Sequence, residues 1–394
     1  MSAPVARRIV LEGAAHIGQG SLRAELPSGE VRTFGVPGRE PEASIRVNDD
    51  AAFSRVLTGG EIAAGETYMD GLWDSPNLEK LLELGILNRE HAPPMVKRLN
   101  DLSRSASRAL HMSRNNTHEG SRDNVSAHYD LGNDFFRLFL DETLTYSCAV
   151  FASPEQPLAD AQRNKYHRLC EKAGLFAGDH LLEIGSGWGG FAIYAAQNYG
   201  CRVTTITISK EQHGLATERV ADAGLSDRVK VLYSDYRDVT GSFDKIVSIE
   251  MFEAVGAEYF ETYFQKCDAV LKAGGRMALQ TIAVPDRTFE DLRDGVNWMQ
   301  KYIFPGGMLP SLEALQRASR STSLRITDIE DVGKHYPPTL RAWRHRFFDN
   351  IDAVRALGFD ERFVRMWEYY LCASEAGFTT RSTSDLQLVL DKSQ

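Results

Sequence analysis

The sequence predicts an α/β fold built on a doubly wound, mostly parallel sheet, and three observations support this prediction. Apolar β-like runs alternate with helical runs from residue 180 onward. A glycine-rich turn follows the first of these runs. Two later β-like runs bring the expected number of strands to seven. Such alternation is typical of parallel sheets, which bind ligands at the carboxyl ends of their strands.

The first 113 residues predict a small α/β module. A β-hairpin is expected over 22–34, because apolar and charged residues alternate on either side of Pro27-Ser28-Gly29. Apolar spacing predicts helices over Asp49–Leu57 and Asn77–Leu87. This module is a candidate for lipid or membrane contact.

A basic stretch follows the module. Between residues 97 and 114 apolar residues recur at helical spacing, and five basic residues face a single acid, Asp101. This pattern suits either a solvated helix between two domains or an amphipathic segment on an anionic membrane. The polar stretch 114–124 is the expected linker.

The remainder, 125–394, is the expected catalytic domain. The predicted helices are Phe191–Asn198, Glu211–Ala223 and Tyr259–Leu271, and the predicted strands are His180–Ile184, Arg202–Ile208, Val229–Tyr233, Lys245–Ile249, Arg276–Ile282, Leu324–Ile329 and Asp385–Leu390. An insertion around 286–310, with exposed-looking aromatic residues such as Trp298 and Tyr302, suggests a cap over an apolar substrate. Those two residues also suit plain core.

The glycine-rich turn allows two cofactor classes. Gly185, Gly187 and Gly190 satisfy the dinucleotide pattern GxGxxG, which is a weak signal by itself. A dinucleotide site needs an acid about 20 residues later, yet the strand Arg202–Ile208 ends without a carboxylate. Glu183, two residues before the first glycine, fits the E-x-G-x-G-x-G opening of methyltransferases that use S-adenosylmethionine (SAM). Methyl transfer is therefore favoured.

Composition narrows the function further. The net charge of −9 argues against general nucleic-acid binding. The five cysteines show neither a CxxC motif nor metal-ligand spacing, which indicates reduced thiols and no metal. No signal peptide and no apolar run of roughly 18 residues is visible. We expect a cytoplasmic protein with peripheral contact to the inner face of the membrane.

Four strings resemble one family. They are His128–Phe136, Leu144–Cys148, Met251–Gly256 and Lys301–Gly307. In this order they resemble the cyclopropane fatty acid synthases, a family that includes mycolic acid cyclopropane synthases and fatty-acyl C-methyltransferases. The resemblance implies a class I SAM-methyltransferase fold and SAM-dependent reaction at the double bond of unsaturated phospholipid acyl chains. A homodimer is a further expectation.

The resemblance also implies a chemistry and the residues that perform it. The alkene attacks the SAM methyl group, and a base, thought to be bicarbonate, removes a proton from the resulting carbocation so that a cyclopropane closes. Matching the strings residue by residue gives Cys148 and Glu253 as candidate catalytic residues. Two further strings add Tyr336, from His335–Trp343, and Gln280 and Ile282, from Leu279–Ile282. Gln280 stands where the family has histidine. An amide can hold an anion but cannot titrate, so proton loss from a chain carbon, giving a branched product, is the alternative.

The implied cofactor residues lie around the glycine turn. Gly185, Gly187 and Gly189 are expected near the methionine and ribose of SAM, and Tyr146 and Ser147 near its methionine end. Thr207 and Gln212 are expected to replace the usual ribose acid, and Asp235 and Tyr236 to contact adenine.

Two other readings remain. Some plant relatives of the family N-methylate small amines, so a small-molecule substrate is less favoured but open. A non-catalytic lipid-binding protein on the same scaffold is the third reading, and the intact SAM strings argue against it.

Overall fold

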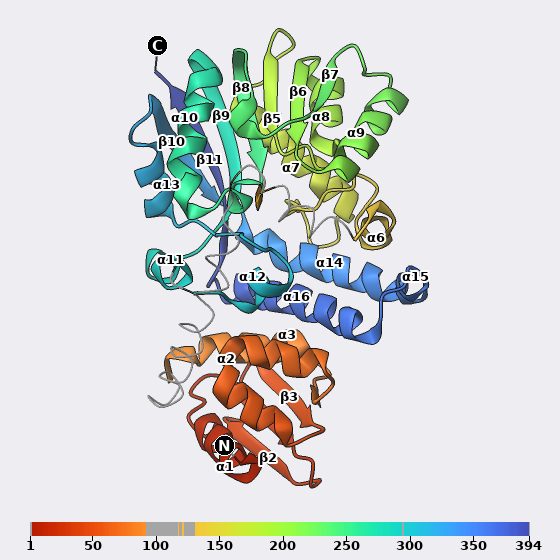
Figure 1. The fold of residues 1–394 in the computed structure, drawn as a ribbon, viewed down its shortest axis with the longest axis vertical. Helices are drawn as coiled ribbons and strands as arrows, with labels where there is room; N and C mark the ends of the chain where they lie inside the picture. Colours follow the sequence, from red (N-terminus) through yellow and green to blue (C-terminus); the bar gives the residue numbers. More distant parts are fainter. Residues whose placement is uncertain (1, 92–116, 118–119, 122–130, 294, 394) are drawn as a thin grey trace. The chain divides into compact units, whose positions relative to one another are not determined.

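The computed structural model describes residues 2–91, 117, 120–121, 131–293 and 295–393 (Figure 1). The chain divides into two compact units. The first comprises Met1–Ser113, Asp294–Ile303 and Ile351–Ser382, and the second comprises Arg114–Arg293, Phe304–Asn350 and Thr383–Gln394. The basic stretch 97–114, most of the linker 114–124 and the start of the string His128–Phe136 lie outside the described residues.

The second unit is built on a seven-stranded sheet in the order β10-β11-β9-β8-β5-β6-β7. Strand β11 runs antiparallel to both of its neighbours, whereas the strands from β9 to β7 are parallel. The strands are β5 His180–Ile184, β6 Arg202–Thr207, β7 Val229–Tyr233, β8 Phe243–Ile249, β9 Leu271–Ala283, β10 Leu324–Asp331 and β11 Ser384–Lys392. The predicted mostly parallel, seven-stranded sheet is confirmed.

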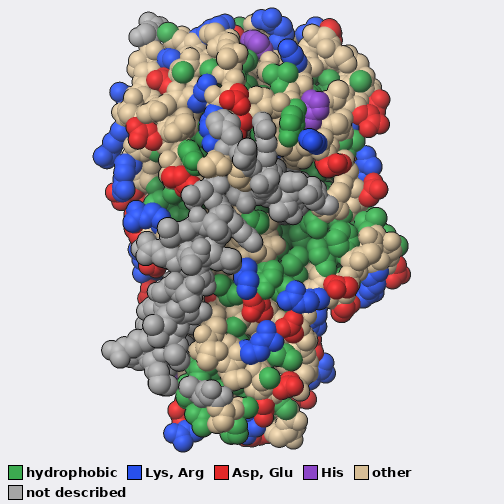
Figure 2. Space-filling view, viewed as in Figure 1, with side chains coloured by type: hydrophobic (Ala, Val, Ile, Leu, Met, Phe, Trp, Pro, Cys, Tyr) green, Lys and Arg blue, Asp and Glu red, His purple; other side chains and the backbone are tan. Residues whose placement is uncertain are grey.

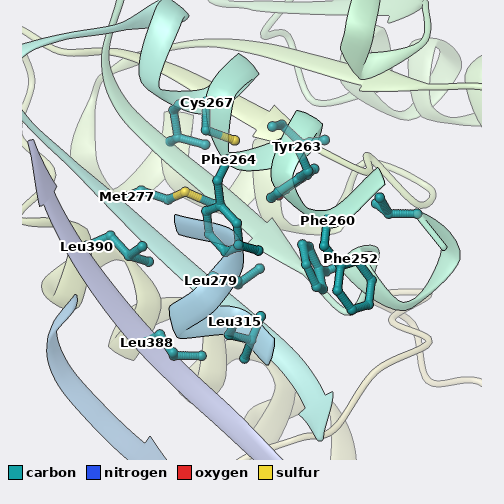
Figure 3. Packing of buried hydrophobic residues seen from close by; sticks show 14 of the residues in the cluster. Phe252, Phe260, Tyr263, Phe264, Cys267, Met277, Leu279, Leu315, Leu388 and Leu390 are labelled. Atoms are coloured by element: carbon teal, nitrogen blue, oxygen red, sulfur yellow. The ribbon is translucent and has the colours of Figure 1, made fainter. Parts of the chain in front are cut away.

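Helices lie on both faces of this sheet (Figure 1). The helices of this unit are α6 Asn133–Phe139, α7 Leu158–Ala173, α8 Gly190–Tyr199, α9 Lys210–Asp222, α10 Phe260–Val270, α11 Asp286–Arg293, α13 Leu312–Ser319 and α14 Tyr336–Asp349, with short 3-10 helices at Tyr236–Asp238, Phe252–Ala254, Ala257–Tyr259 and Gly333–His335. One core cluster packs residues of α7 and α8 on the sheet. The other packs residues of α10 and α13 on it, with Phe252, Phe260 and Phe264 at its centre (Figure 3). These two apolar layers hold the strand ends in place.

The first unit has its own sheet, in the order β2-β1-β3-β4. Its strands are β1 Ser21–Glu25, β2 Val31–Gly35, β3 Glu42–Val47 and β4 Trp73–Asp74, and its helices are α1 Ala3–Ala14, α2 Ala51–Met69, α3 Leu78–Leu87, α12 Trp298–Tyr302, α15 Ile351–Ala356 and α16 Glu361–Thr379, with a 3-10 turn at Arg89–His91. The predicted hairpin is present as β1 and β2. Helix α2 consists of two helical segments that meet at a kink at Gly60 (φ 58°, ψ −140°), and the predicted helix Asp49–Leu57 corresponds to the first of them.

The predicted cap region 286–310 is shared between the two units. Trp298 is buried, which confirms the alternative that it belongs to a core: only 1% of it is accessible, and its ring lies against those of Tyr302 and Tyr369 in the first unit. A cap over the substrate stays a prediction.

Charged groups on the face drawn in Figure 2 are mixed, with acidic and basic side chains interspersed among the coloured residues. Within the described ranges, no helix combines the length and the apolar character needed to cross a bilayer.

Candidate active site

The turn after β5 is shaped by glycine backbone. Gly185, Gly187 and Gly189 have φ angles of 96°, 48° and 84°, a region that side chains disfavour. The N–H groups of Gly185 and Ser186 donate to the carbonyl of Ile206 on β6, at 3.1 and 2.9 Å, which fixes the turn to the sheet. A Cβ added at Gly187 would meet no protein atom within 4 Å. The turn therefore offers open space beside exposed backbone.

A buried carboxyl stands behind this turn. Glu183 is 2% exposed and lies opposite Thr205 on β6, whose hydroxyl donates to Glu183 Oε2 at 2.5 Å. Burial raises the pKa of Glu183 to about 8, against the opposing effect of that hydrogen bond. Its carboxyl is therefore mostly protonated at neutral pH.

The other predicted cofactor residues already have protein partners. Thr207 Oγ1 donates to Gln212 Oε1 at 2.8 Å. Asp235 accepts from Arg237 Nε and Nη2 at 2.9 and 2.7 Å. The ring of Tyr236 packs against Tyr263 in the core. Their contacts to adenine and ribose stay predictions.

Tyr146 and Ser147 connect an aromatic group to a buried lysine. The Tyr146 ring lies 5.2 Å from the ring of Trp343, and Phe136 and Phe139 complete the group. Ser147 Oγ accepts from Lys165 Nζ at 2.6 Å, and Lys165 is fully buried. Burial lowers the pKa of Lys165 to about 8, although Glu250 and other nearby acids favour its charged form.

Three of the predicted catalytic residues converge on one carboxylate, that of Glu250. The backbone N–H of Cys148 and the side-chain amide of Gln280 each donate to Oε1 at 2.8 Å. The hydroxyl of Tyr336 donates to Oε2 at 2.5 Å. These donors come from a loop, from β9 and from α14, so the tertiary fold assembles the cluster.

Two residues of β11 fix the Gln280 amide. Gln387, its cross-strand partner, donates to Gln280 Oε1 at 2.9 Å, which leaves Nε2 to donate. That nitrogen also donates to Asp385 Oδ2 at 2.9 Å. Burial and then the charges of Glu250 and Glu253 raise the pKa of Asp385 well above its usual value.

Glu253 lies in a separate arrangement with Ile282 and Thr281. Its Oε1 accepts from the Ile282 N–H at 2.5 Å and from Thr281 Oγ1 at 2.9 Å. Its Oε2 is buried and has no hydrogen-bond partner within the described residues. Burial, followed by the charge of Glu250, raises the pKa of Glu253 to about 8.

The Cys148 thiol has a different environment from that of its backbone. It is fully buried, and burial raises its pKa well above the usual value. A buried, protonated thiol is a poor nucleophile, so the contribution of Cys148 to the cluster is its N–H group.

Sequence reasoning missed four members of this cluster: Glu250, Asp385, Gln387 and Lys165. One signal was available for Glu250, because it directly follows a buried parallel strand, and ligands bind where such strands end. Asp385 and Gln387 lie on a late antiparallel strand, and their proximity depends on strand register.

The glycine turn fits SAM. Open space at Gly187 leaves room for a ligand that carries a nucleoside and is bound through backbone contacts. The backbone of Gly185, Gly187 and Gly189 would hold SAM. Contacts of Tyr146 and Ser147 with its methionine end stay predictions.

Comparison with known proteins places the chain in a family. Residues 116–388 match the family described as mycolic acid cyclopropane synthetase. The chain is 40% identical to the tuberculostearic acid methyltransferase UfaA1 of Mycobacterium tuberculosis, over 96% of this chain and 88% of that protein. It is 38% identical to the cyclopropane-fatty-acyl-phospholipid synthase of Escherichia coli K12, over 89% and 88%.

A solved structure agrees. The mycolic acid cyclopropane synthase CmaA1, complexed with SAH and CTAB, superposes with a TM-score of 0.64 at 32% identity, covering 69% of this chain and 98% of that one. The glycine turn, the sheet order and these matches lead to one conclusion: the chain belongs to the mycolic acid cyclopropane synthetase family and is a SAM-dependent methyltransferase.

Proposed function

We propose that the protein methylates the double bond of unsaturated phospholipid acyl chains. The observation that carries this proposal is the position of Tyr336. Its hydroxyl donates to the Glu250 carboxylate, and its ring lies 6.2 Å from that of Trp343, a member of the aromatic group around Tyr146. A carboxylate beside an aromatic group suits a reaction through a carbocation, which needs both a base and shielding from water.

Three groups of residues would bind SAM, stabilise the carbocation and accept the proton. SAM supplies an electrophilic methyl group when it is bound, and the glycine turn would hold it. The aromatic group of Tyr146, Trp343, Phe136 and Phe139 would stabilise positive charge on the acyl chain and exclude water. The carboxylate cluster would receive the proton that the chain must lose.

For the product, we favour a branched acyl chain. The relative that matches 96% of the chain is named a tuberculostearic acid methyltransferase, and Gln280, unlike histidine, cannot carry a proton. A cyclopropane ring is the second candidate, supported by the E. coli synthase. Bicarbonate, peripheral membrane binding and a homodimer stay predictions.

Deuterated SAM tests both the function and the product. Purified protein is incubated with vesicles of unsaturated phospholipid and methyl-deuterated SAM, and the fatty acids are fragmented by mass spectrometry. Ring closure removes one deuteron from the new methyl group, whereas proton loss from a chain carbon keeps all of them. An unlabelled lipid fraction, together with methylation of small amines, would overturn the proposal.

A further inference from the structure

We propose that Glu250 is the general base of the reaction, so that the chain carries its own base and needs no added anion. This inference rests on the proposed function and names a residue for its proton-transfer step. Glu250 is not among the catalytic residues predicted from the sequence, and this role is inferred from the geometry around it.

Hydrogen bonding fixes Glu250 on both oxygens. Oε1 accepts from the Cys148 N–H and from Gln280, and Oε2 accepts from Tyr336. The Asp385 side chain also lies in hydrogen-bonding contact with Glu250. Three donors from three separate segments, together with this carboxyl, therefore hold the Glu250 side chain in place.

The backbone at Glu250 is strained. Its φ of 47° lies in the left-handed region, one of three such non-glycine residues among the described residues. Holding a glutamate there strains the backbone, and such strain clusters at active sites. Glycine would adopt this conformation freely, so the fold accepts a strained residue where a carboxylate is needed.

Glu250 also lies beside the cofactor turn. Strand β8 is the parallel neighbour of β5, and Ser248 pairs with Ile184 just before the two strands end. The next residue after Glu250, Met251, would contact a Cβ added at Gly185 at 2.9 Å. The base and the turn expected to hold the methyl donor therefore lie at adjacent strand ends.

The neighbouring ionisable groups leave Glu250 as the available base. Burial raises the pKa of Glu253 to about 8 and that of Asp385 well above its usual value, so burial favours the protonated form of both. Lys165 adds a buried cation that interacts with Glu250 and Asp385. Three hydrogen-bond donors and this cation therefore all face the Glu250 carboxylate.

In the proposed step, Glu250 accepts a proton from the carbocation that methyl transfer creates. Methyl transfer to one alkene carbon breaks the S–CH3 bond of SAM and leaves the other alkene carbon cationic. A C–H bond on a chain carbon adjacent to the cationic carbon then breaks to give a new C=C bond, or a C–H bond of the new methyl group breaks and its electron pair closes the ring. In either case the proton moves to a Glu250 oxygen. The proton then leaves to solvent, and the carboxylate is restored.

Two variants test this role. E250Q keeps the volume and removes the basic oxygen, and E250G removes the side chain while relieving the strained φ. We expect E250Q to lose on the order of 10²-fold in methyl transfer with unchanged SAM affinity by calorimetry. We expect formate to restore part of the activity of E250G. The same substitutions at exposed Glu258 in the next 3-10 turn are the matched controls and should change nothing.

The parent protein provides the second arm. Its rate should not change when carbon dioxide and bicarbonate are removed from the assay. Normal methyl transfer by E250Q, or a parent rate that follows bicarbonate, would overturn the role of Glu250. A parent that labels no lipid at all would instead overturn the proposed function.

Discussion

The two halves of the site are built in different ways. At the turn after β5 the backbone forms the site, and open space replaces side chains at Gly187. At the ends of β8, β9 and β11 the site is formed mainly by side chains. The Glu250 carboxylate there accepts from the Gln280 amide, the Tyr336 hydroxyl and the backbone N–H of Cys148. The comparison indicates that shape binds the methyl donor, whereas charge placement controls the proton.

The electrostatics of the two halves differ accordingly. The turn has one buried acid, Glu183, paired with a single hydroxyl. In the cluster, burial and the charge of Glu250 raise the pKa values of Glu253 and Asp385, and Lys165 is the buried cation. Substitutions at the turn should therefore act on binding, and substitutions in the cluster on turnover.

The largest effect should come from filling the turn. Gly187→Val places a side chain in the open space and should weaken SAM binding by on the order of 10²-fold or more, equivalent to about 2.7 kcal/mol. Calorimetric titration measures the affinity, and circular dichroism checks the fold. Gly187→Ala separates bulk from backbone strain, and Gly214→Val on exposed α9 is the control. Retained affinity in Gly187→Val would mean that this turn does not bind the cofactor.

A smaller effect is expected from the second carboxyl of the cluster. Glu253→Gln keeps an oxygen to accept from Ile282 and Thr281, so the fold should survive. Turnover should fall by about 10²-fold, because the variant loses the ionisable carboxyl that interacts electrostatically with Glu250. Steady-state kinetics should show the loss in kcat and an unchanged Kd for SAM. A normal kcat would show that Glu250 acts without Glu253.

Removing one donor should have a still smaller effect. Tyr336→Phe deletes the hydroxyl that donates to Glu250 Oε2 but keeps the ring beside Trp343. A hydrogen bond to a charged group is worth about 1.5–3 kcal/mol, and the two donors on Oε1 remain, so we expect about a 10-fold loss of kcat. A loss as large as that of E250Q would instead assign the proton to the tyrosine.

The sequence predicts the first half of the site better than the second, for a physical reason. The strand, the turn and helix α8 are consecutive, so local rules for glycine and apolar spacing are enough to place them. The seven strands follow from the same rules, and only details differ, such as the second helical segment after the kink at Gly60.

The cluster depends on contacts between distant residues. Gln387 reaches Gln280 only because β11 pairs antiparallel with β9 in one register. Cys148, Gln280 and Tyr336, which the resemblance placed around an external anion, donate to Glu250, and no local pattern shows that three donors converge there. Strand order and register, which arise from the whole fold, decide which carboxyl receives them.

Glu183 offers the mildest test of the comparison, through stability rather than activity. Its pKa rises from 4.5 to about 8 on burial. The folded state therefore favours the protonated form, and stability falls as pH increases from about 4.5 to about 8. Glu183→Gln has no proton to lose and can still accept from Thr205. At pH 8 the free energy of unfolding of the variant should therefore exceed that of the parent by a few kcal/mol at most. At pH 5 the two should be nearly equal.

Thermal unfolding of the ligand-free protein at pH 5 and pH 8 measures this difference, with Glu258→Gln as the exposed control. An advantage that grows by a few degrees toward pH 8 would show that the turn holds a neutral acid behind the cofactor. An equal or opposite trend would mean that Glu183 is charged. The turn would then hold a buried charge, as the cluster does, and backbone shape alone would not distinguish the cofactor half of the site from the proton-transfer half.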